Sequence, residues 1–457
     1  MNNKTLEALA PYGLLALLFV AALAFRPLLP IDETRYLTVA WEMFLQKQYA
    51  VLSLNFEPYH HKPPLLFWLI NGVWEVLGVS RWSALIPIFT ASALAMFLTQ
   101  KLATTLKLDN GVIKQVPWIM IGSLPFLIYN TLIMFDVMIM TILLAVLTTM
   151  LSHSQNPRFY KPLLAGLLIG LGVLAKGPVM YLYVLWPLVL YPFWKPQDAV
   201  NKGRFYAATA IAVLVSALPV LAWLIPALTQ TGNDFAFWLV WNQTAGRVTG
   251  NFSASHARPV YFYLLLAPIL FMPWICHPRV WKNWSALKNH AAFKFLIAAA
   301  LPTFISFSLI SGKQPHYLLP LLPFIIISIS ILLEAPPVKK ISLAMCTLII
   351  IGQLIAHHTF IERYDLTPVA EEYKKQRDKD WAFAPKYQGE IGFLAKVEKP
   401  ITSLQYDQLE DWLKNHPDGL AMMRHKTHHI LENYKEEFSQ PYKGRSMGIF
   451  SYKPANP

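Results

Sequence analysis

A succession of long apolar segments constrains this chain more than any other feature of its sequence. Several of them hold 17 or more nearly uncharged residues, which is enough for a helix to cross the hydrocarbon core of a bilayer. With 55% hydrophobic and 14% charged residues, the 457-residue chain is far more apolar than a soluble domain. We therefore expect an all-α polytopic membrane protein. The expected spans lie near 8–29, 82–100, 116–133, 136–151, 162–176, 178–194, 205–226, 260–276, 292–310, 316–333 and 341–358.

The segment 64–79 determines which way the chain is oriented. It is apolar, and if it crossed the bilayer, every later loop would change sides. When it lies flat at the membrane surface, the loops on the side of the N-terminus hold 15 basic residues and those on the other side hold 9. Lys and Arg are enriched in cytoplasmic loops. The charge pattern therefore predicts a cytoplasmic N-terminus, amphipathic helices at the outer surface, and a C-terminal tail outside.

Residues 359–457 form a second expected domain, after a transmembrane domain at 1–358. The tail holds 15 Lys and Arg against 15 Asp and Glu, which leaves 24 basic and 11 acidic residues in the membrane part. The positive charge thus belongs to loops beside membrane spans and does not indicate nucleic-acid binding. Short apolar runs alternate in the tail with helix-like stretches, as is typical of a small soluble α/β domain. The runs lie at 381–384, 391–397, 420–423 and 447–452, and the helix-like stretches near 366–378, 405–415 and 428–437.

Two polar motifs interrupt the apolar sequence early in the chain. The first reads Asp-Glu-Thr-Arg-Tyr over 32–36, and the second reads Tyr-His-His-Lys-Pro-Pro over 59–64. Residues 33–46 carry apolar side chains at helical spacing, so we expect Asp32 at the N-cap of an amphipathic helix. The free N–H groups and the helix dipole favour an ionised carboxylate there. Asp32 is therefore either a helix cap alone or a functional carboxylate at the membrane surface.

Two further charged residues stand where charge is costly. Lys62 precedes the proline pair that begins 64–79, and a helix N-terminus suits an anionic ligand. A lysine that snorkels from an interfacial helix is the alternative. Asp136 is the only acidic residue between Asp109 and Asp198. A carboxylate in apolar sequence usually faces a cavity or a partner, so Asp136 is either functional or half of a structural ion pair.

The longest polar insertion of the membrane part covers residues 229–259 and contains Arg247 and His256. A loop of this length in a compact protein is often functional. His60, His61 and His256 are candidates for a metal site, although their spacing is not diagnostic. The pattern Gly-Leu-Leu-Ile-Gly over 166–170 favours helix packing over phosphate binding. The sequence contains no Walker loop and no GxGxxG loop, so it gives no support to a nucleotide-driven mechanism.

The order of these motifs resembles that of the polyprenyl-phosphate-sugar-dependent glycosyltransferases of the GT-C fold. This superfamily includes the lipid A aminoarabinose transferase and the protein O-mannosyltransferases (PMT). Any one motif is weak, but six in the same order are specific, and the lipid A branch is the more similar one. The six motifs are Asp32–Tyr36, Lys62–Leu65, Asp136, Leu174–Pro178, His256–Tyr261 and Ser311–Pro320.

The resemblance implies a fold and roles for single residues. It implies a GT-C fold with about 11–13 transmembrane helices. Asp32 is implied as the catalytic carboxylate, with Glu33 beside it and Asp136 as its partner. The residues implied to hold the donor phosphate are Tyr59, Lys62, Arg247, Lys313 and Tyr317.

The chain departs from the lipid A branch in its second motif. Relatives in that branch commonly have Phe-Glu before Lys-Pro-Pro, whereas this chain has His60-His61. A metal contact made by that glutamate therefore does not carry over directly, although His61 and His256 offer replacement ligands. We expect that no cofactor is required, with a bound divalent metal as the open alternative.

The activity that the resemblance implies is transfer of a hexosyl or pentosyl group from polyprenyl phosphate to an extracytoplasmic acceptor. The acceptor is expected to be lipid A or another envelope glycan, with a protein serine or threonine as the alternative. A transporter or flippase of lipid-linked sugars is the alternative from another class, but such proteins typically show internal repeats, and none is obvious here. The resemblance places the protein in the bacterial inner membrane, among membrane lipids, with its active site and C-terminal domain on the periplasmic side.

Overall fold

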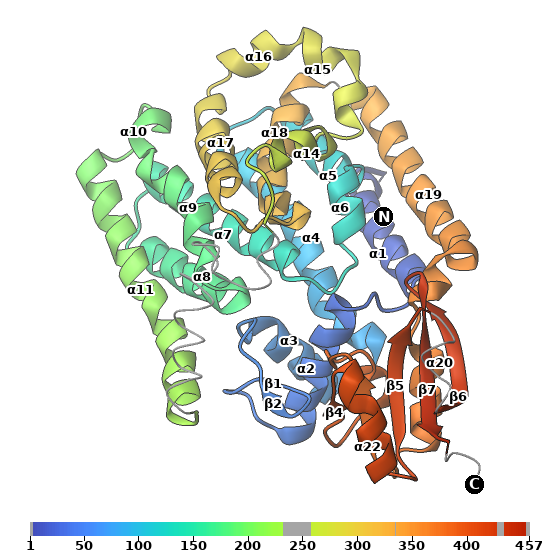
Figure 1. Cartoon of the computed structure of the whole chain (residues 1–457). Helices are drawn as coiled ribbons and strands as arrows, with labels where there is room; N and C mark the ends of the chain where they lie inside the picture. The colour runs from blue at the N-terminus through green and yellow to red at the C-terminus, as the bar shows by residue number, and fades with distance from the viewer. Residues whose placement is uncertain (1–2, 232–256, 334, 427–433, 454–457) are drawn as a thin grey trace.

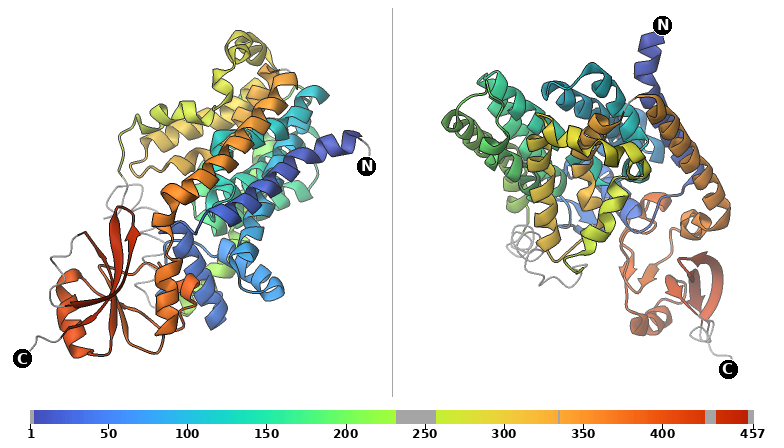
Figure 2. Two further views of the ribbon diagram at one scale, coloured as in Figure 1. Left: turned by 90° about the vertical axis from the view of Figure 1, so that its right-hand side faces the viewer. Right: turned by 90° about the horizontal axis from the view of Figure 1, so that it is seen from above.

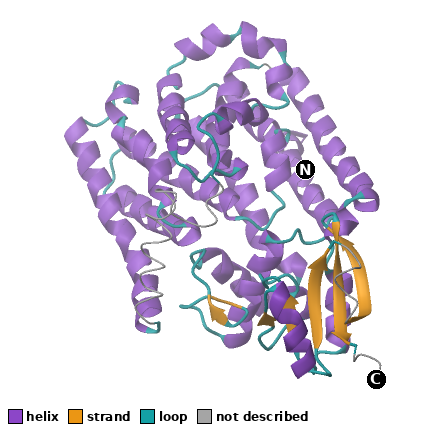
Figure 3. Cartoon of the chain, in the orientation of Figure 1, coloured by secondary structure: helices purple, strands orange, loops and turns teal. Residues whose placement is uncertain are grey.

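The computed structural model describes residues 3–231, 257–333, 335–426 and 434–453. Most of these residues are helical, and one group of strands lies in the C-terminal part (Figures 1 and 3). Within the described residues, six helices are long and apolar enough to cross a membrane, so the protein is a multi-pass membrane protein. They are α1 (Asn3–Phe25), α4 (Arg81–Thr105), α7 (Phe135–Gln155), α11 (Lys202–Thr229), η3 with α18 (Pro315–Leu321, Leu322–Leu332) and α19 (Ala335–Thr359).

Shorter helices complete the membrane part. The expected span at 162–176 is α8 (Tyr160–Lys176), and those at 178–194 and 292–310 contain α9 (Val179–Val189) and α17 (Phe293–Leu309). The expected span at 260–276 holds only α14 (Phe262–Leu270) and the short turn η2 (Trp274–Cys276). This part also contains the very short helices α10 (Tyr191–Trp194), α15 (Pro278–Lys282) and α16 (Trp284–Asn289).

The expected span at 116–133 is divided between two helices, α5 (Asn110–Ile121) and α6 (Leu124–Tyr129). The break leaves polar groups without partners inside the helix, and other segments form hydrogen bonds with them. The backbone N–H of Leu124 donates to the Met272 carbonyl at 3.0 Å, and the indole N–H of Trp274 donates to the Ser123 hydroxyl at 2.9 Å. A broken helix within a membrane needs such partners, because lipid supplies none.

The glycine pair 166–170 packs α8 against α11. A Cβ atom added at Gly166 would lie 2.5 Å from the Ala212 carbonyl oxygen, and one added at Gly170 would lie 2.3 Å from Cγ of Pro219. Only glycine allows the two helices to approach this closely. The interpretation of this pattern as a helix-packing motif is confirmed.

Two shorter helices lie at one end of the bundle, beside the C-terminal strands (Figure 1). They are α2 (Asp32–Gln46) and α3 (Leu65–Leu77). At 1.5 Å per residue, α3 is roughly 20 Å long, too short to cross a hydrocarbon core of about 30 Å. This length fits the expectation that 64–79 lies at the membrane surface. The hairpin β1 (Ser53–Leu54) and β2 (Glu57–Pro58) connects the two helices.

The C-terminal part is a small α/β domain, as expected. Its five strands pair in the order β4-β3-β5-β7-β6, parallel among β4, β3 and β5 and antiparallel from β5 to β6. The strands are β3 (Trp381–Ala384), β4 (Thr402–Ser403), β5 (Leu420–His425), β6 (Tyr434–Tyr442) and β7 (Arg445–Tyr452). The helices are η4 (Ile361–Tyr364), α20 (Thr367–Lys375), α21 (Gly392–Ala395), η5 (Tyr406–Gln408) and α22 (Leu409–Asn415).

Two element predictions for this domain are wrong. The apolar run at 391–397 was contrasted with the helix-like stretches, but it contains the short helix α21. The apolar side chains of this run pack over the sheet and against α2. Residues 434–437 of the helix-like stretch near 428–437 belong to strand β6, and 428–433 lie outside the described residues. Antiparallel pairing with β7 takes precedence over the local helical pattern in β6.

The C-terminal domain packs directly against α2, and Figure 2 shows the two side by side in a second view. The hydroxyl of Thr38 donates to the Gly389 carbonyl at 2.9 Å and accepts from the Phe393 N–H at 3.0 Å. The Trp41 indole donates to the Val397 carbonyl at 2.8 Å. A Cβ atom added at Gly392 would lie 2.3 Å from the methyl carbon of Thr38. The helix that begins with Asp32 is thus held between the membrane helices and the sheet domain.

Candidate active site

Asp32 is the first residue of α2, and Ile31 occupies the N-cap position. The expectation that Asp32 caps the helix is therefore wrong by one residue. Its carboxylate still lies in the first turn, where the helix dipole favours negative charge. The side chain is exposed, and the Tyr36 hydroxyl donates to it at 3.4 Å. Asp32 is thus an accessible carboxylate at the start of a well-supported helix.

Glu33 has a different environment from its neighbour. It is only 2% exposed and forms a buried ion pair with Arg26. The same carboxylate accepts hydrogen bonds from the backbone N–H groups of Leu29 at 3.0 Å and Ile133 at 2.9 Å. These bonds occupy both oxygens, so the geometry favours a structural role for Glu33 over the catalytic one that the resemblance implies.

Asp136 is the second residue of α7 and is also buried. It forms an ion pair with Lys176, the last residue of α8, and its other oxygen lies 3.9 Å from Nε2 of His316. The ammonium of Lys176 lies 4.4 Å from the centroid of the Tyr317 ring. Four residues from three sequence motifs therefore meet at this point. Asp136 is therefore half of an ion pair, as one of the two alternatives predicts, and its functional role stays a prediction.

Phe135 connects the Asp136 cluster to the beginning of α2. Its ring packs edge-on against Tyr36 with centroids 4.9 Å apart. The ammonium of Lys62 lies 5.6 Å from the centroid of the same Phe135 ring. Because Tyr36 lies one turn after Asp32, this contact brings the motifs of Asp32, Lys62 and Asp136 to a single place.

The second motif forms a compact aromatic group. The rings of Tyr59 and His61 lie 5.3 Å apart, and those of His60 and His61 stack at 4.8 Å. Burial and the positive charge of Lys386 lower the pKa of His60, which favours the neutral imidazole. Within the described residues, neither histidine joins a group of three metal-ligating side chains. A metal held by His61 and His256 stays a prediction, because His256 lies outside the described residues.

Lys313 and Tyr317 both belong to the last motif but have different contacts. Lys313 is 2% exposed, and its ammonium donates to the carbonyls of Arg258, at 2.9 Å, and Ile310. It thereby fixes the turn before η3, which favours a structural role over phosphate binding. The Tyr183 hydroxyl donates to the Tyr317 carbonyl at 2.6 Å and holds that motif in place. Arg247 lies outside the described residues.

Sequence reasoning missed the contribution of the C-terminal domain to this region. Arg35, three residues after Asp32, donates to the side-chain amide of Gln388. The ammonium of Lys443 donates to the Pro30 carbonyl at 2.8 Å. No motif marks Gln388 or Lys443 in the sequence, so only the tertiary structure reveals their place. His316 belongs to the motif Ser311–Pro320, and Arg26 is a charged residue shortly before the first motif, so the sequence could have indicated both.

Comparison with solved structures decides the fold. The chain matches the crystal structure of ArnT from Cupriavidus metallidurans bound to undecaprenyl phosphate with a TM-score of 0.81 at 15% identity, over 98% of this chain and 99% of that one. The chain has the GT-C fold. A more distant GT-C match is the archaeal oligosaccharyltransferase AglB from Archaeoglobus fulgidus, with a TM-score of 0.54, 12% identity and coverage of 92% and 70%.

Sequence comparisons agree with this GT-C assignment and with the resemblance seen in the motifs. Residues 61–223 match the family described as dolichyl-phosphate-mannose-protein mannosyltransferase. The undecaprenyl phosphate-alpha-4-amino-4-deoxy-L-arabinose arabinosyl transferase of Yersinia enterocolitica is 26% identical over 67% of this chain and 55% of its own length. That of Pseudomonas fluorescens is 27% identical over 64% and 51%. The matched region thus spans about half the length of these relatives.

Proposed function

We propose that the protein is a membrane glycosyltransferase that moves a sugar from a polyprenyl-phosphate donor to an extracytoplasmic acceptor. The observation that carries this proposal is the meeting of the Asp32, Lys62 and Asp136 motifs around Phe135 in a chain with the GT-C fold. The similar structure of ArnT was solved with undecaprenyl phosphate, and the similar sequences belong to transferases named for an undecaprenyl-phosphate sugar.

The arrangement suits a reaction whose leaving group is a lipid phosphate. An acceptor oxygen attacks the anomeric carbon, the bond from that carbon to the phosphate oxygen breaks, and the bonding electrons remain on the phosphate. Lys62 stabilises the charge that develops there, an interaction stronger in the transition state than in the ground state. Asp32 orients the acceptor and takes its proton late in the step if the acceptor is a hydroxyl. An ionised acceptor phosphate needs no base.

The proposed acceptor is lipid A or another envelope glycan, since the similar curated sequences carry the aminoarabinose transferase name. We also propose that the protein lies in the bacterial inner membrane, with the Asp32 region and the C-terminal domain on the periplasmic side. A protein serine or threonine is the second candidate acceptor, because residues 61–223 match a protein mannosyltransferase family.

The test is mass spectrometry of lipid A and envelope glycans from cells that lack the protein, or that contain either the wild type or Asp32→Asn. We expect a sugar-sized mass to disappear from the acceptor in both the deletion strain and the variant strain. Asp109→Asn and Asp198→Asn serve as matched controls, because both residues are exposed, lie between helices and belong to none of the six motifs. Wild-type glycosylation by Asp32→Asn would overturn the catalytic assignment, and vectorial lipid flipping retained by that variant would favour a transporter.

A further inference from the structure

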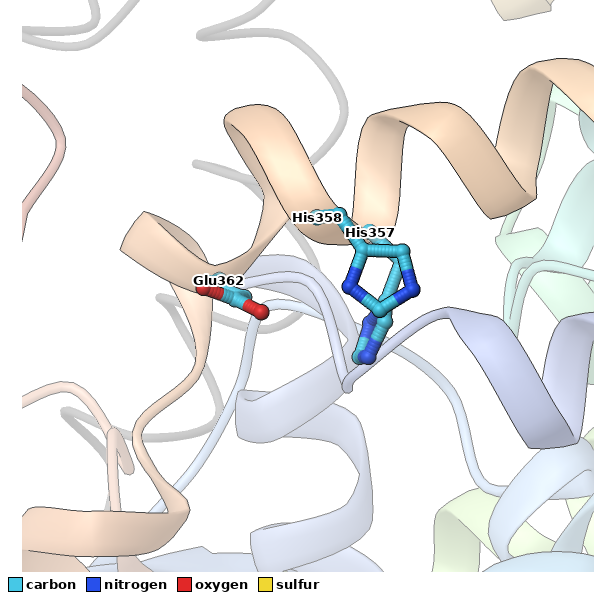
Figure 4. Close-up of side chains that lie close together, drawn as sticks. All are labelled: His357, His358 and Glu362. Carbon is cyan, nitrogen blue, oxygen red and sulfur yellow. The ribbon is translucent and has the colours of Figure 1, made fainter.

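Two histidines and a glutamate, none of them assigned a part in transfer, gather at the end of the last membrane helix. His357 and His358 lie in the final turn of α19, and Glu362 lies in the following turn, η4. Their ligand atoms all lie within 4.8 Å of one another. Figure 4 shows the Glu362 side chain extending from η4 toward the two imidazole rings.

The environment of this cluster leaves ligand atoms available. Nδ1 of His357 is buried and has no hydrogen-bond partner among the residues that the structure describes. His358 and Glu362 are exposed, so an ion has access from solvent. His357 and Glu362 also line a pocket of about 220 Å³, together with Asp365 and the guanidinium-bearing residues Arg26 and Arg81. A buried ring nitrogen without a partner is costly, and a bound cation would remove that cost.

The ligand types indicate which ion fits. Imidazole nitrogen together with one carboxylate suits Zn²⁺ and related transition metals, whereas Mg²⁺ and Ca²⁺ prefer sites built from oxygen. In a tetrahedral zinc site with bonds of about 2.0–2.2 Å, neighbouring ligand atoms lie roughly 3.4 Å apart. Small rotations of the exposed His358 and Glu362 side chains would close the present separation. A water molecule would complete the coordination.

We propose that His357, His358 and Glu362 bind one divalent transition metal ion, with Zn²⁺ as the best match. The ion connects the last turn of α19 to η4 and so fixes the junction between the membrane helices and the C-terminal domain. All three ligands lie within six consecutive residues, so the site forms independently of the transfer reaction and of a metal at His61. The alternative role for these histidines is interaction with the helix dipole at the C-terminus of α19, which does not involve Glu362.

The test uses the purified full-length protein in detergent, treated with a chelator and then titrated with Zn²⁺ or Co²⁺. We expect the wild type to bind one more ion per chain than a His357→Ala/His358→Ala double variant, by elemental analysis. Glu362→Gln is expected to weaken Zn²⁺ binding by at least about tenfold. Co²⁺ in the wild type should show the strong visible absorption of a four-coordinate site. Size-exclusion profiles in the absence of metal check that each variant is folded.

Two controls make the result specific. His290→Ala changes a histidine in the loop between α16 and α17 and is expected to leave the ion content unchanged. His61→Ala is expected to retain the α19 ion even if it removes another. The proposal fails if the double variant keeps the wild-type metal content, if Glu362→Gln binds Zn²⁺ as tightly as the wild type, or if His290→Ala loses the same ion.

Discussion

The carboxylate of Glu33 accepts a hydrogen bond from the backbone N–H of Ile133, 2.9 Å away, and so connects the beginning of α2 to the loop before α7. Its ion pair with Arg26 adds a third segment to this junction. Two residues that are adjacent in sequence therefore differ in function, because Asp32 is exposed whereas Glu33 is enclosed. This junction determines where the Asp32 carboxylate lies relative to Asp136.

We expect Glu33→Ala to destabilise the protein by about 3–5 kcal/mol, because it leaves the buried Arg26 charge without its partner. Thermal unfolding in detergent, followed by intrinsic fluorescence, would measure the loss. Glu57→Ala is the control, since Glu57 is exposed in β2 and should change stability little. A Glu33→Ala protein that unfolds at the wild-type temperature but lacks transfer activity would instead support a catalytic role.

The ion pair between Asp136 and Lys176 is expected to behave as a unit. Asp136→Asn and Lys176→Met should each destabilise the protein, because each leaves one buried charge unpaired. The double variant should be more stable than the sum of the two single losses predicts. A double-mutant cycle on unfolding free energies measures this coupling, expected at about 0.5–3 kcal/mol. Additive losses would show that the pair contributes no mutual stabilisation.

Gly170→Val is expected to destabilise the packing of α8 on α11 by about 1–3 kcal/mol, since the added side chain would meet Pro219. The measurement is the unfolding temperature of the purified protein. Gly13→Val in α1 is a matched control, because a Cβ atom at Gly13 meets nothing within 4 Å. If both variants unfold at the wild-type temperature, the close approach of α8 and α11 does not limit stability.

Stability should depend on pH through Lys396, whose ammonium lies 3.5 Å from the centroid of the Phe393 ring and 5.0 Å from that of Trp41. Desolvation there lowers the pKa of Lys396 from 10.5 to about 7. Between these two values the unfolded chain binds more protons than the folded one, so stability from this group rises with pH across that window. Below about pH 7 the penalty is fully present.

Lys396→Met removes this dependence. We expect the variant to be more stable than the wild type near pH 7, with a gain that shrinks as the pH approaches 10. Unfolding temperatures of both proteins at several pH values would measure it. Lys399→Met, at an exposed position three residues further on, serves as the control. A gain of the same size at every pH would contradict the assignment of this effect to the Lys396 charge.

The sequence predicts the membrane class, because that class depends on local patterns, and the roles of the motif residues stay predictions. Long apolar runs require helices, and the motifs around Asp32, Lys62 and Asp136 are visible without a structure. The structure brings these motifs together around Phe135, a contact that no spacing rule predicts, since its members come from three separate segments.

Other features depend on tertiary contacts and were missed or misassigned. The break between α5 and α6 depends on the Met272 carbonyl, about 150 residues away in the chain. Residues 434–437, the first part of strand β6, were expected to be helical, because their local pattern does not show the pairing with β7. Asp32 is exposed whereas Glu33 is buried, because Glu33 pairs with Arg26. The apolar sequence around Arg26 does not indicate which carboxylate it pairs with.

The contacts of the sheet domain with α2 have a consequence for evolution and for protein engineering. Thr38, Trp41 and Asn55 all form hydrogen bonds with backbone atoms of the C-terminal domain. A domain exchanged between homologues at the end of α19 would have to bring matching backbone positions for the α2 and hairpin side chains. Residues 32–58 and the C-terminal domain are therefore expected to evolve together. Chimeras should be most active when both segments come from the same homologue.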